Sequence, residues 1–245
     1  MAYCIVYDKI FRESLSKITK RGKNQVIKAI IFDAFGTLFQ VTSGGSARTI
    51  MKNIADCGTV VDGQIFLQEW KDYYKKHTAG ACKLMTERDI FISRIRMFYE
   101  HYGVCRNAEA DADALLAGAY EREAYPEAKD VLTALKEKYL IFIGSNTDND
   151  VLKSVMHKNN ITVDKVYTSE NLKCYKPNSQ FYTHILKDNA LSPQEVWFVG
   201  DSVTDDVLGP KSVGMKTVWV DRGGAGGDYG QEKTVQDLKE LIEYL

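Results

Sequence analysis

Several signatures of common protein classes are missing from this sequence. No apolar run approaches the roughly 20 residues needed to cross a bilayer, and the run at residues 3–7 is too short for a signal peptide. The five cysteines form no CxxC pair, which argues against a disulfide framework and predicts reduced thiols. The 32 Lys and Arg residues nearly balance the 33 Asp and Glu residues, so no global field attracts nucleic acid. We therefore expect a cytoplasmic protein with neither a nucleic-acid nor a membrane partner.

Two hydrolase signatures are absent as well. The four histidines show no HExxH or other ligand spacing, which argues against a zinc site. The GxSxG motif of many serine hydrolases does not occur. The chain nevertheless has 245 residues, of which 44% are hydrophobic and 27% charged, as in an ordinary globular protein of one or two domains. Any hydrolytic chemistry therefore has to use other groups.

Short apolar runs predict the buried strands of a parallel sheet. They cover residues 29–32, 139–144, 165–167, 196–200 and 216–220. Segments with apolar residues at helical spacing lie between them, and Pro126 stands at a plausible first helical position. Strands that alternate with helices of this length indicate an α/β fold with a parallel sheet.

The stretch from residue 43 to residue 118 breaks this alternation. It contains no β-like run, and its apolar residues recur at helical spacing, as in Ile90, Phe91 and Ile95. Thr86 followed by Asp89 is typical of a helix start. We predict an α/β core formed by residues 29–42 and 119–245, with an all-helical cap inserted at residues 43–118 and an N-terminal extension at residues 1–28.

Polar residues follow several of the predicted strands, where ligands bind in an open parallel sheet. Asp33 ends the first strand and is placed to act as a carboxylate nucleophile. Thr37 in the following turn offers a hydrogen-bond donor, and Ser145 and Asn146 offer a hydroxyl and an amide after the second strand. Lys176 would balance negative charge near Asp33.

An acidic loop completes this set. Asp201, Asp205 and Asp206 follow the fourth strand and form an oxygen-rich group suited to Mg²⁺. Taken singly, each of these polar residues has an ordinary structural explanation as a cap or a turn residue. Their joint placement at strand ends, in this order, favours a functional site.

Four segments, in their order along the chain, resemble the motifs of the haloacid dehalogenase superfamily. They are residues 30–38, Ser145-Asn146-Thr147, Lys176-Pro177 and Gly200-Asp201-Ser202 through Asp206. The resemblance covers nearly everything from residue 28 to residue 245. It implies a Rossmann-like three-layer core with a parallel sheet and a mobile helical cap inserted after the first motif.

The resemblance also implies roles for individual residues. Asp33 would be the nucleophile, assisted by Thr37, Ser145, Asn146 and Lys176. Mg²⁺ would be held by the Asp33 side chain, the Phe35 backbone carbonyl and Asp201, with support from Asp206 or Asp205.

Phe35 is the main departure from the superfamily's phosphatases, which resemble this chain otherwise. Their residue at this position is normally a second Asp that protonates the leaving group, whereas an aromatic residue is typical of members that cleave carbon–halogen bonds. Tyr182 also fits those members. Asp201 does not, because the metal-independent dehalogenases carry a Ser there. Their cap arginine is not evident either, since Lys71 stands after Trp70.

We favour a Mg²⁺-dependent phosphatase that acts on a small phosphorylated metabolite through an aspartyl phosphate on Asp33. The acidic loop carries more weight than Phe35 because carboxylates beside Asp33 would repel one another without a cation. The alternatives are a 2-haloacid dehalogenase-like hydrolase and a catalytically weak binder of a phosphate ligand. The three hypotheses can be distinguished by experiment. A phosphatase needs Mg²⁺, a dehalogenase works in the presence of chelator, and a binder turns over no substrate.

Overall fold

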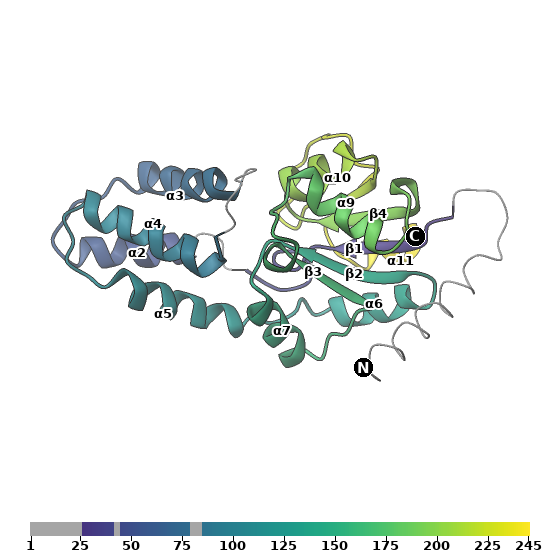
Figure 1. Ribbon diagram of the computed structural model, residues 1–245, viewed down its shortest axis with the longest axis horizontal. Helices are drawn as coiled ribbons and strands as arrows, with labels where there is room; N and C mark the ends of the chain where they lie inside the picture. Colours follow the sequence, from purple (N-terminus) through teal and green to yellow (C-terminus); the bar gives the residue numbers. More distant parts are fainter. Residues whose placement is uncertain (1–25, 42–44, 79–84) are drawn as a thin grey trace.

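The computed structural model describes residues 26–41, 45–78 and 85–245. The predicted N-terminal extension lies almost entirely outside these residues, as do the first two residues of the predicted insertion. An α/β unit and a helical unit lie next to each other along the longest axis of the molecule (Figure 1). None of the helices in the described residues is both long enough and apolar enough to span a membrane.

The α/β unit contains a parallel sheet with the strand order β3-β2-β1-β4-β5-β6. Its strands are β1 (Ala29–Phe32), β2 (Leu140–Ser145), β3 (Lys165–Thr168), β4 (Val196–Gly200), β5 (Lys216–Val220) and β6 (Lys233–Val235). The five predicted strands are all present, with β2 displaced by one residue from the expected range. The edge strand β6 was not predicted, because its three residues include a half-buried lysine and threonine and form no apolar run.

Alternate side chains of each central strand face opposite layers of helices. In β1, Ile30 and Phe32 pack on one side, whereas Ala29 and Ile31 pack on the other. The first side is covered by α6 (Ala128–Lys136), α7 (Asn149–Lys158) and α11 (Glu240–Tyr244), and the second mainly by α9 (Ser179–Asp188). Burial on both faces explains why the strands are apolar throughout. The predicted three-layer Rossmann-like fold is confirmed.

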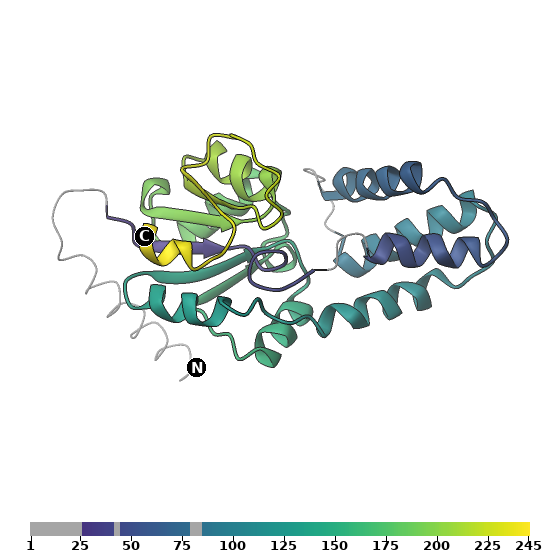
Figure 2. The same cartoon turned by 180° about the vertical axis from the view of Figure 1, so that it is seen from behind.

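In the described residues between β1 and α6, four helices form the helical cap (Figure 2). They are α2 (Gly45–Ala55), α3 (Gly63–Thr78), α4 (Glu87–His101) and α5 (Ala108–Tyr120). The cap has a core of its own, in which the Phe66 and Phe98 rings lie 4.4 Å apart between centroids. The predicted helix start is confirmed, because the Thr86 side chain accepts a hydrogen bond from the Asp89 backbone N–H.

Two chain segments cross between the core and the cap, and they pair with each other. The Gln40 N–H donates to the Glu123 carbonyl at 2.8 Å, and the Tyr125 N–H donates to the Leu38 carbonyl at 2.9 Å. The first segment leaves the carboxyl end of β1, directly after Asp33. This pairing therefore places the cap beside the end of the sheet that carries the predicted site.

Candidate active site

A buried ion cluster lies at the carboxyl ends of β1 and β4. The Lys176 ammonium is 2.8 Å from Asp33 Oδ1 and 2.7 Å from Asp206 Oδ1. All three residues are buried. Burial opposes a charge on Lys176, but the carboxylates of Asp206 and Asp33 raise its pKa above that of an ordinary lysine. Lys176 is therefore a cation at neutral pH.

The loop after β2 positions both the aspartate and the lysine. The Ser145 hydroxyl donates to Asp33 Oδ1 at 3.1 Å. The Asn146 amide makes two bonds to the Lys176 backbone: its Oδ1 accepts from the N–H at 2.7 Å, and its Nδ2 donates to the carbonyl at 3.0 Å. Asn146 thus holds the chain that presents the ammonium, rather than pointing its own amide at a ligand.

Three carboxylates converge at this point. Asp33, Asp201 and Asp206 each offer an oxygen atom, and these atoms lie within 4.8 Å of one another. Asp201 Oδ1 also accepts a bond from the Thr37 hydroxyl at 3.3 Å. Protein atoms around the Asp201 carboxylate, and the charge of Asp33, raise its pKa to about 7, although the residue as a whole is exposed. Burial raises the pKa of Asp206 as well.

Two glycines let these carboxylates approach the backbone. Gly36 has φ +97°, and a Cβ there would lie 2.4 Å from Asp201 Oδ2. A Cβ on Gly200 would lie 2.3 Å from the Asp206 Cγ. Any larger residue would push the acidic loop away from Asp33, so both positions need a residue without a side chain.

The acidic loop directs the carboxylates of Asp205 and Asp206, the two candidates for supporting the cation, to different partners. Its backbone turns through a π-helical segment, η2 (Val203–Leu208), and Asp206 points to Lys176 while the Ser202 N–H binds its second oxygen at 2.9 Å. Asp205 is not part of the carboxylate cluster found in the described residues. Its backbone carbonyl accepts a bond from the Tyr182 hydroxyl at 2.5 Å. Of the two, Asp206 is the carboxylate placed to support a cation.

Phe35 contacts residues that sequence reasoning missed. Its half-buried ring lies under the guanidinium of Arg122, with 4.3 Å between the guanidinium carbon and the ring centroid. Arg122 lines a cavity of about 490 Å³ between the cap helices and the two hinge segments, together with Glu87 and Phe91 of α4. Burial lowers the pKa of Arg122, and the charge of Glu87 partly offsets this effect.

The cap also contains a buried arginine. Arg94 of α4 is 3% exposed, and its guanidinium lies 3.7 Å above the ring of Trp70. One nitrogen donates to the Trp70 carbonyl at 3.1 Å, while Nε has no hydrogen-bond partner in the described part of the chain. Burial lowers the pKa of Arg94 to about 10. No sequence motif indicates Arg94. The sequence shows only that this arginine lies within the apolar face of a predicted helix.

The fold and the site together define a protein with a Rossmann-like core and a carboxylate-centred site beneath a helical cap. A family model of haloacid dehalogenase-like hydrolases matches residues 27–214, and the chain belongs to this family. This family membership agrees with the resemblance carried by the four motifs.

Curated relatives of both chemistries are similar to this chain. (S)-2-haloacid dehalogenase 1 of Pseudomonas sp. (strain CBS-3) is 28% identical over 232 residues, covering 89% of this chain and 96% of the relative. A glyceraldehyde 3-phosphate phosphatase of Pyrococcus abyssi is 28% identical over 200 residues, covering 79% and 81% respectively. The similarities therefore establish a hydrolase of this family without choosing between the two reactions.

Solved structures show the same fold. The L-2-haloacid dehalogenase RSc1362 superimposes with a TM-score of 0.71 at 21% identity, over 89% of this chain and 98% of that one. The HAD hydrolase YfnB of Bacillus subtilis, bound to magnesium, gives a TM-score of 0.70 at 15% identity, over 90% and 99%. At these identities the likeness concerns the architecture alone.

Proposed function

We propose that the protein is a Mg²⁺-dependent phosphatase for a small phosphorylated metabolite. The observation that carries this proposal is the group of Asp33, Asp201 and Asp206 with Lys176 as the basic partner. When ionised, three carboxylates and one ammonium leave two negative charges in a partly buried site. Carboxylates this close repel one another strongly unless a cation or a proton is added.

The donor set fits Mg²⁺, which prefers oxygen ligands and keeps several waters. Asp33, Asp201 and Asp206 would hold the ion, and the Phe35 backbone carbonyl remains a predicted fourth protein ligand. When bound, Mg²⁺ would neutralise charge on the phosphoryl oxygens during transfer. Burial, and to a lesser extent the charge of Asp33, raises the pKa values of Asp201 and Asp206, and a bound cation would favour their ionised forms.

The residues of the chain support a two-step reaction. Ser145 and Lys176 both donate to Asp33 Oδ1, which fixes the carboxylate and leaves Oδ2 for attack on phosphorus. Lys176 would also neutralise the equatorial oxygens of the transferred group. Attack forms an aspartyl phosphate, and water then hydrolyses it to phosphate and restores Asp33. Thr37 and Asn146 act by holding Asp201 and the Lys176 backbone, respectively.

We assign residues 43–118 to the cap and residues 29–42 and 119–245 to the catalytic core. Closure of the cap would exclude bulk water and supply substrate specificity. We place the activity in the cytoplasm, in agreement with the free thiols of Cys57, Cys105 and Cys174.

The test is phosphate release from p-nitrophenyl phosphate with Mg²⁺ and with chelator, using Asp33→Asn as the inactive control. We expect turnover with Mg²⁺ that chelator and the substitution both abolish. Absence of release from this activated ester with Mg²⁺ would overturn the proposal.

A second candidate is a 2-haloacid dehalogenase-like hydrolase. Phe35 favours it, because a halide leaves without needing a proton, and the Arg122 guanidinium beside Phe35 is placed to bind a substrate carboxylate. Several relatives of this chain are (S)-2-haloacid dehalogenases. Halide release from a 2-haloacid in chelator would establish it. Failure of both assays would leave a binder of a phosphate ligand.

A further inference from the structure

Phe35 leaves the proposed phosphatase without the proton donor that its core would otherwise carry. A phenyl ring transfers no proton, and an alkoxide is a poor leaving group unless it is protonated as it departs. Asp201 and Asp206 are committed to the proposed cation. A proton donor from the cap would complete the site. Such a donor would have to lie where the cap meets the core.

The start of α4 is fixed to the core by hydrogen bonds from two catalytic loops. The N–H groups of Glu87 and Arg88 donate to the two Asp148 carboxylate oxygens at 2.9 and 3.3 Å. The Tyr175 hydroxyl donates to the Met85 carbonyl at 2.7 Å. Asp148 stands three residues after Ser145, and Tyr175 directly precedes Lys176. The backbone at Glu87 is therefore tied to the segment that follows Ser145 and to the residue that precedes Lys176.

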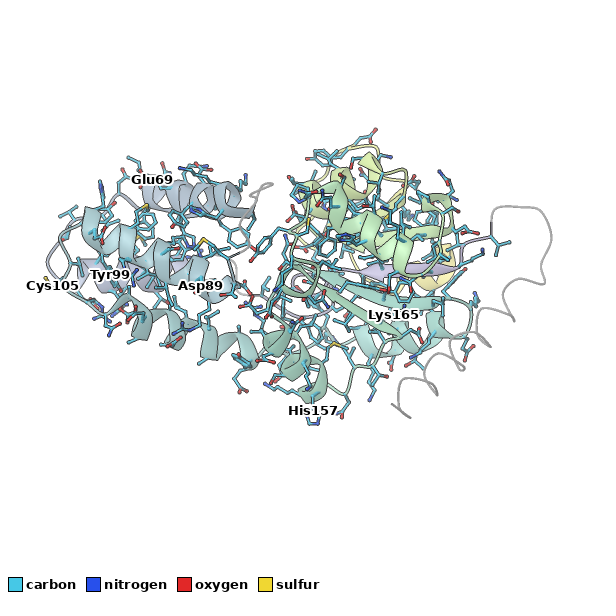
Figure 3. The ribbon with its side chains drawn as sticks, viewed as in Figure 1. Glu69, Asp89, Tyr99, Cys105, His157 and Lys165 are labelled. Carbon is cyan, nitrogen blue, oxygen red and sulfur yellow. The ribbon has the colours of Figure 1, made fainter. Side chains whose placement is uncertain are left out.

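The picture of the side chains agrees with this placement. Asp89, two residues after Glu87, lies at the end of α4 that faces the core, whereas Cys105 lies at the far tip of the cap (Figure 3). The Glu87 side chain is half-buried, and its Oε2 accepts a bond from the Thr147 hydroxyl at 3.4 Å. It forms no ion pair within the described residues. It lines the same cavity as Arg122, whose guanidinium covers the Phe35 ring.

We propose that Glu87 is the general acid of this enzyme, a cap residue that donates the leaving-group proton in place of the residue at position 35. This inference rests on the proposed phosphatase function and assigns a catalytic role to that site. It also assigns the substrate class: phosphate esters of alcohols, whose leaving groups need a proton.

The charges around Glu87 suit this role. Burial, and then the charge of Asp148, raises the pKa of Glu87 to about 7, while Arg122, the Thr147 hydroxyl and Arg94 act in the opposite direction. The positive end of α4 also favours the carboxylate. The neighbouring hydroxyls of Tyr74 and Tyr175 have pKa values above their ordinary range, mainly through burial, and stay neutral. A carboxyl group with a pKa near neutrality can both give and take a proton at working pH.

The reaction balances as follows. Asp33 Oδ2 forms a bond to phosphorus, the bond from phosphorus to the ester oxygen breaks, and that oxygen takes the proton of the Glu87 carboxyl group to leave as an alcohol. Glu87 is then a carboxylate. In the second step water attacks phosphorus and gives its proton to Glu87, and the bond to Asp33 breaks, which regenerates both carboxyl groups in their starting states.

The experiment compares two esters in the wild type and in Glu87→Gln, both with Mg²⁺. In p-nitrophenyl phosphate the leaving group departs readily without a proton, whereas in phenyl phosphate it resembles a tyrosine side chain with a pKa of about 10. We expect Glu87→Gln to lower kcat/KM for phenyl phosphate by about 10²-fold or more and to change it less than about tenfold for the nitrophenyl ester. In the wild type, kcat/KM for phenyl phosphate alone should fall as pH rises through about 7.

Glu100→Gln is the matched control, because Glu100 is an exposed residue of the same helix and its substitution removes the same charge. It should leave both esters unaffected. An equal loss on both esters in Glu87→Gln, or identical wild-type pH profiles for the two, would overturn the role of Glu87 while leaving the phosphatase in place. No Mg²⁺-dependent turnover of the nitrophenyl ester by the wild type would instead overturn the proposed function and this inference with it.

Discussion

The core and the cap treat buried charge in opposite ways. In the core, Lys176 lies within 2.8 Å of two carboxylates, and Ser145 donates to the first of them. In the cap and at its hinge, Glu87, Arg94 and Arg122 are buried or half-buried. None of these three forms an ion pair in the part of the chain that the structure describes. The two groups therefore differ in whether a charged side chain has an oppositely charged side chain within ion-pair distance.

This difference separates the two tasks of the proposed enzyme. A site whose charges are already paired keeps its geometry before the substrate arrives, which suits the residues that perform the chemistry. Charges that lack an ion-pair partner are costly in the free protein, and a bound substrate would relieve that cost. The core would then supply the reaction, and the cap would select the substrate.

The largest effect is expected from breaking the paired cluster in the core. Lys176→Met removes the ammonium and leaves Asp33 and Asp206 facing each other without it. Loss of one partner of a buried ion pair costs about 3–5 kcal/mol, so the free energy of unfolding should fall by that amount at pH 8 without Mg²⁺. Urea denaturation measures it. A loss below about 1 kcal/mol would show that the cluster does not depend on Lys176.

The next effect concerns the proposed cation. Mg²⁺ at 100 times its dissociation constant should stabilise the wild type by about 2.7 kcal/mol if it binds only the folded chain. Asp201→Asn should reduce this stabilisation markedly, because one of the converging carboxylates is lost. Thermal unfolding with and without Mg²⁺ measures the change. Equal stabilisation of the wild type and the variant would place the ion elsewhere.

A smaller effect is expected from Glu87, and it depends on pH. Its pKa of about 7 lies above its ordinary value of 4.5, so the folded state binds the proton more tightly than the unfolded state. Wild-type stability should therefore decrease as pH rises from about 4.5 to about 7. Glu87→Gln never ionises and should be more stable than the wild type by about 1–2 kcal/mol at pH 8, with a smaller difference at pH 5.

Melting temperatures at pH 5 and pH 8 test this prediction, with Glu100→Gln as the exposed control. A difference between Glu87→Gln and the wild type that stays constant with pH would contradict it. The same result would also mean that ionised Glu87 does not destabilise the folded state. The cap and the core would then not differ in the way described above.

The smallest effect is expected from Arg94→Met. The substitution removes a buried cation without leaving a carboxylate unpaired, and methionine still packs on the Trp70 ring. Stability should change by no more than about 1 kcal/mol, since apolar replacement of a buried charge is often neutral. A loss as large as that of Lys176→Met, in the same urea assay, would show that Arg94 has a partner equivalent to Asp33 and would break the comparison.

The core of the fold was predictable because its signals are local. Runs such as residues 29–32 and 196–200 are apolar throughout only because both faces are buried, and that burial is visible in the residues themselves. The site residues Asp33, Ser145, Lys176 and Asp201 could be named for a related reason. Asp33, Ser145 and Asp201 end a strand or follow it directly, and Lys176 lies in the longer segment between β3 and α9. The carboxyl ends of parallel strands meet at one edge of the sheet.

Other features depend on how the chain turns and on pairing between separate segments, which no local pattern shows. The choice of Asp206 over Asp205 was decided by the turn of η2, which brings the Asp206 carboxylate to Lys176 and leaves the Asp205 carboxylate outside the cluster, next to the Asn146 amide. The edge strand β6 is paired only because β5 supplies hydrogen bonds to it, and its own residues carry no strand pattern.

The sequence by itself therefore determined the fold class, the nucleophile candidate and the family, since these follow from local patterns and from the order of those patterns along the chain. Only the tertiary structure brought Glu87 to Thr147, 60 residues away, laid Arg122 on Phe35 and buried Arg94 against Trp70. A helix periodicity states which face is buried but not what lies opposite that face. The contacts of the cap with the core were decided by packing across the hinge, where no local pattern exists.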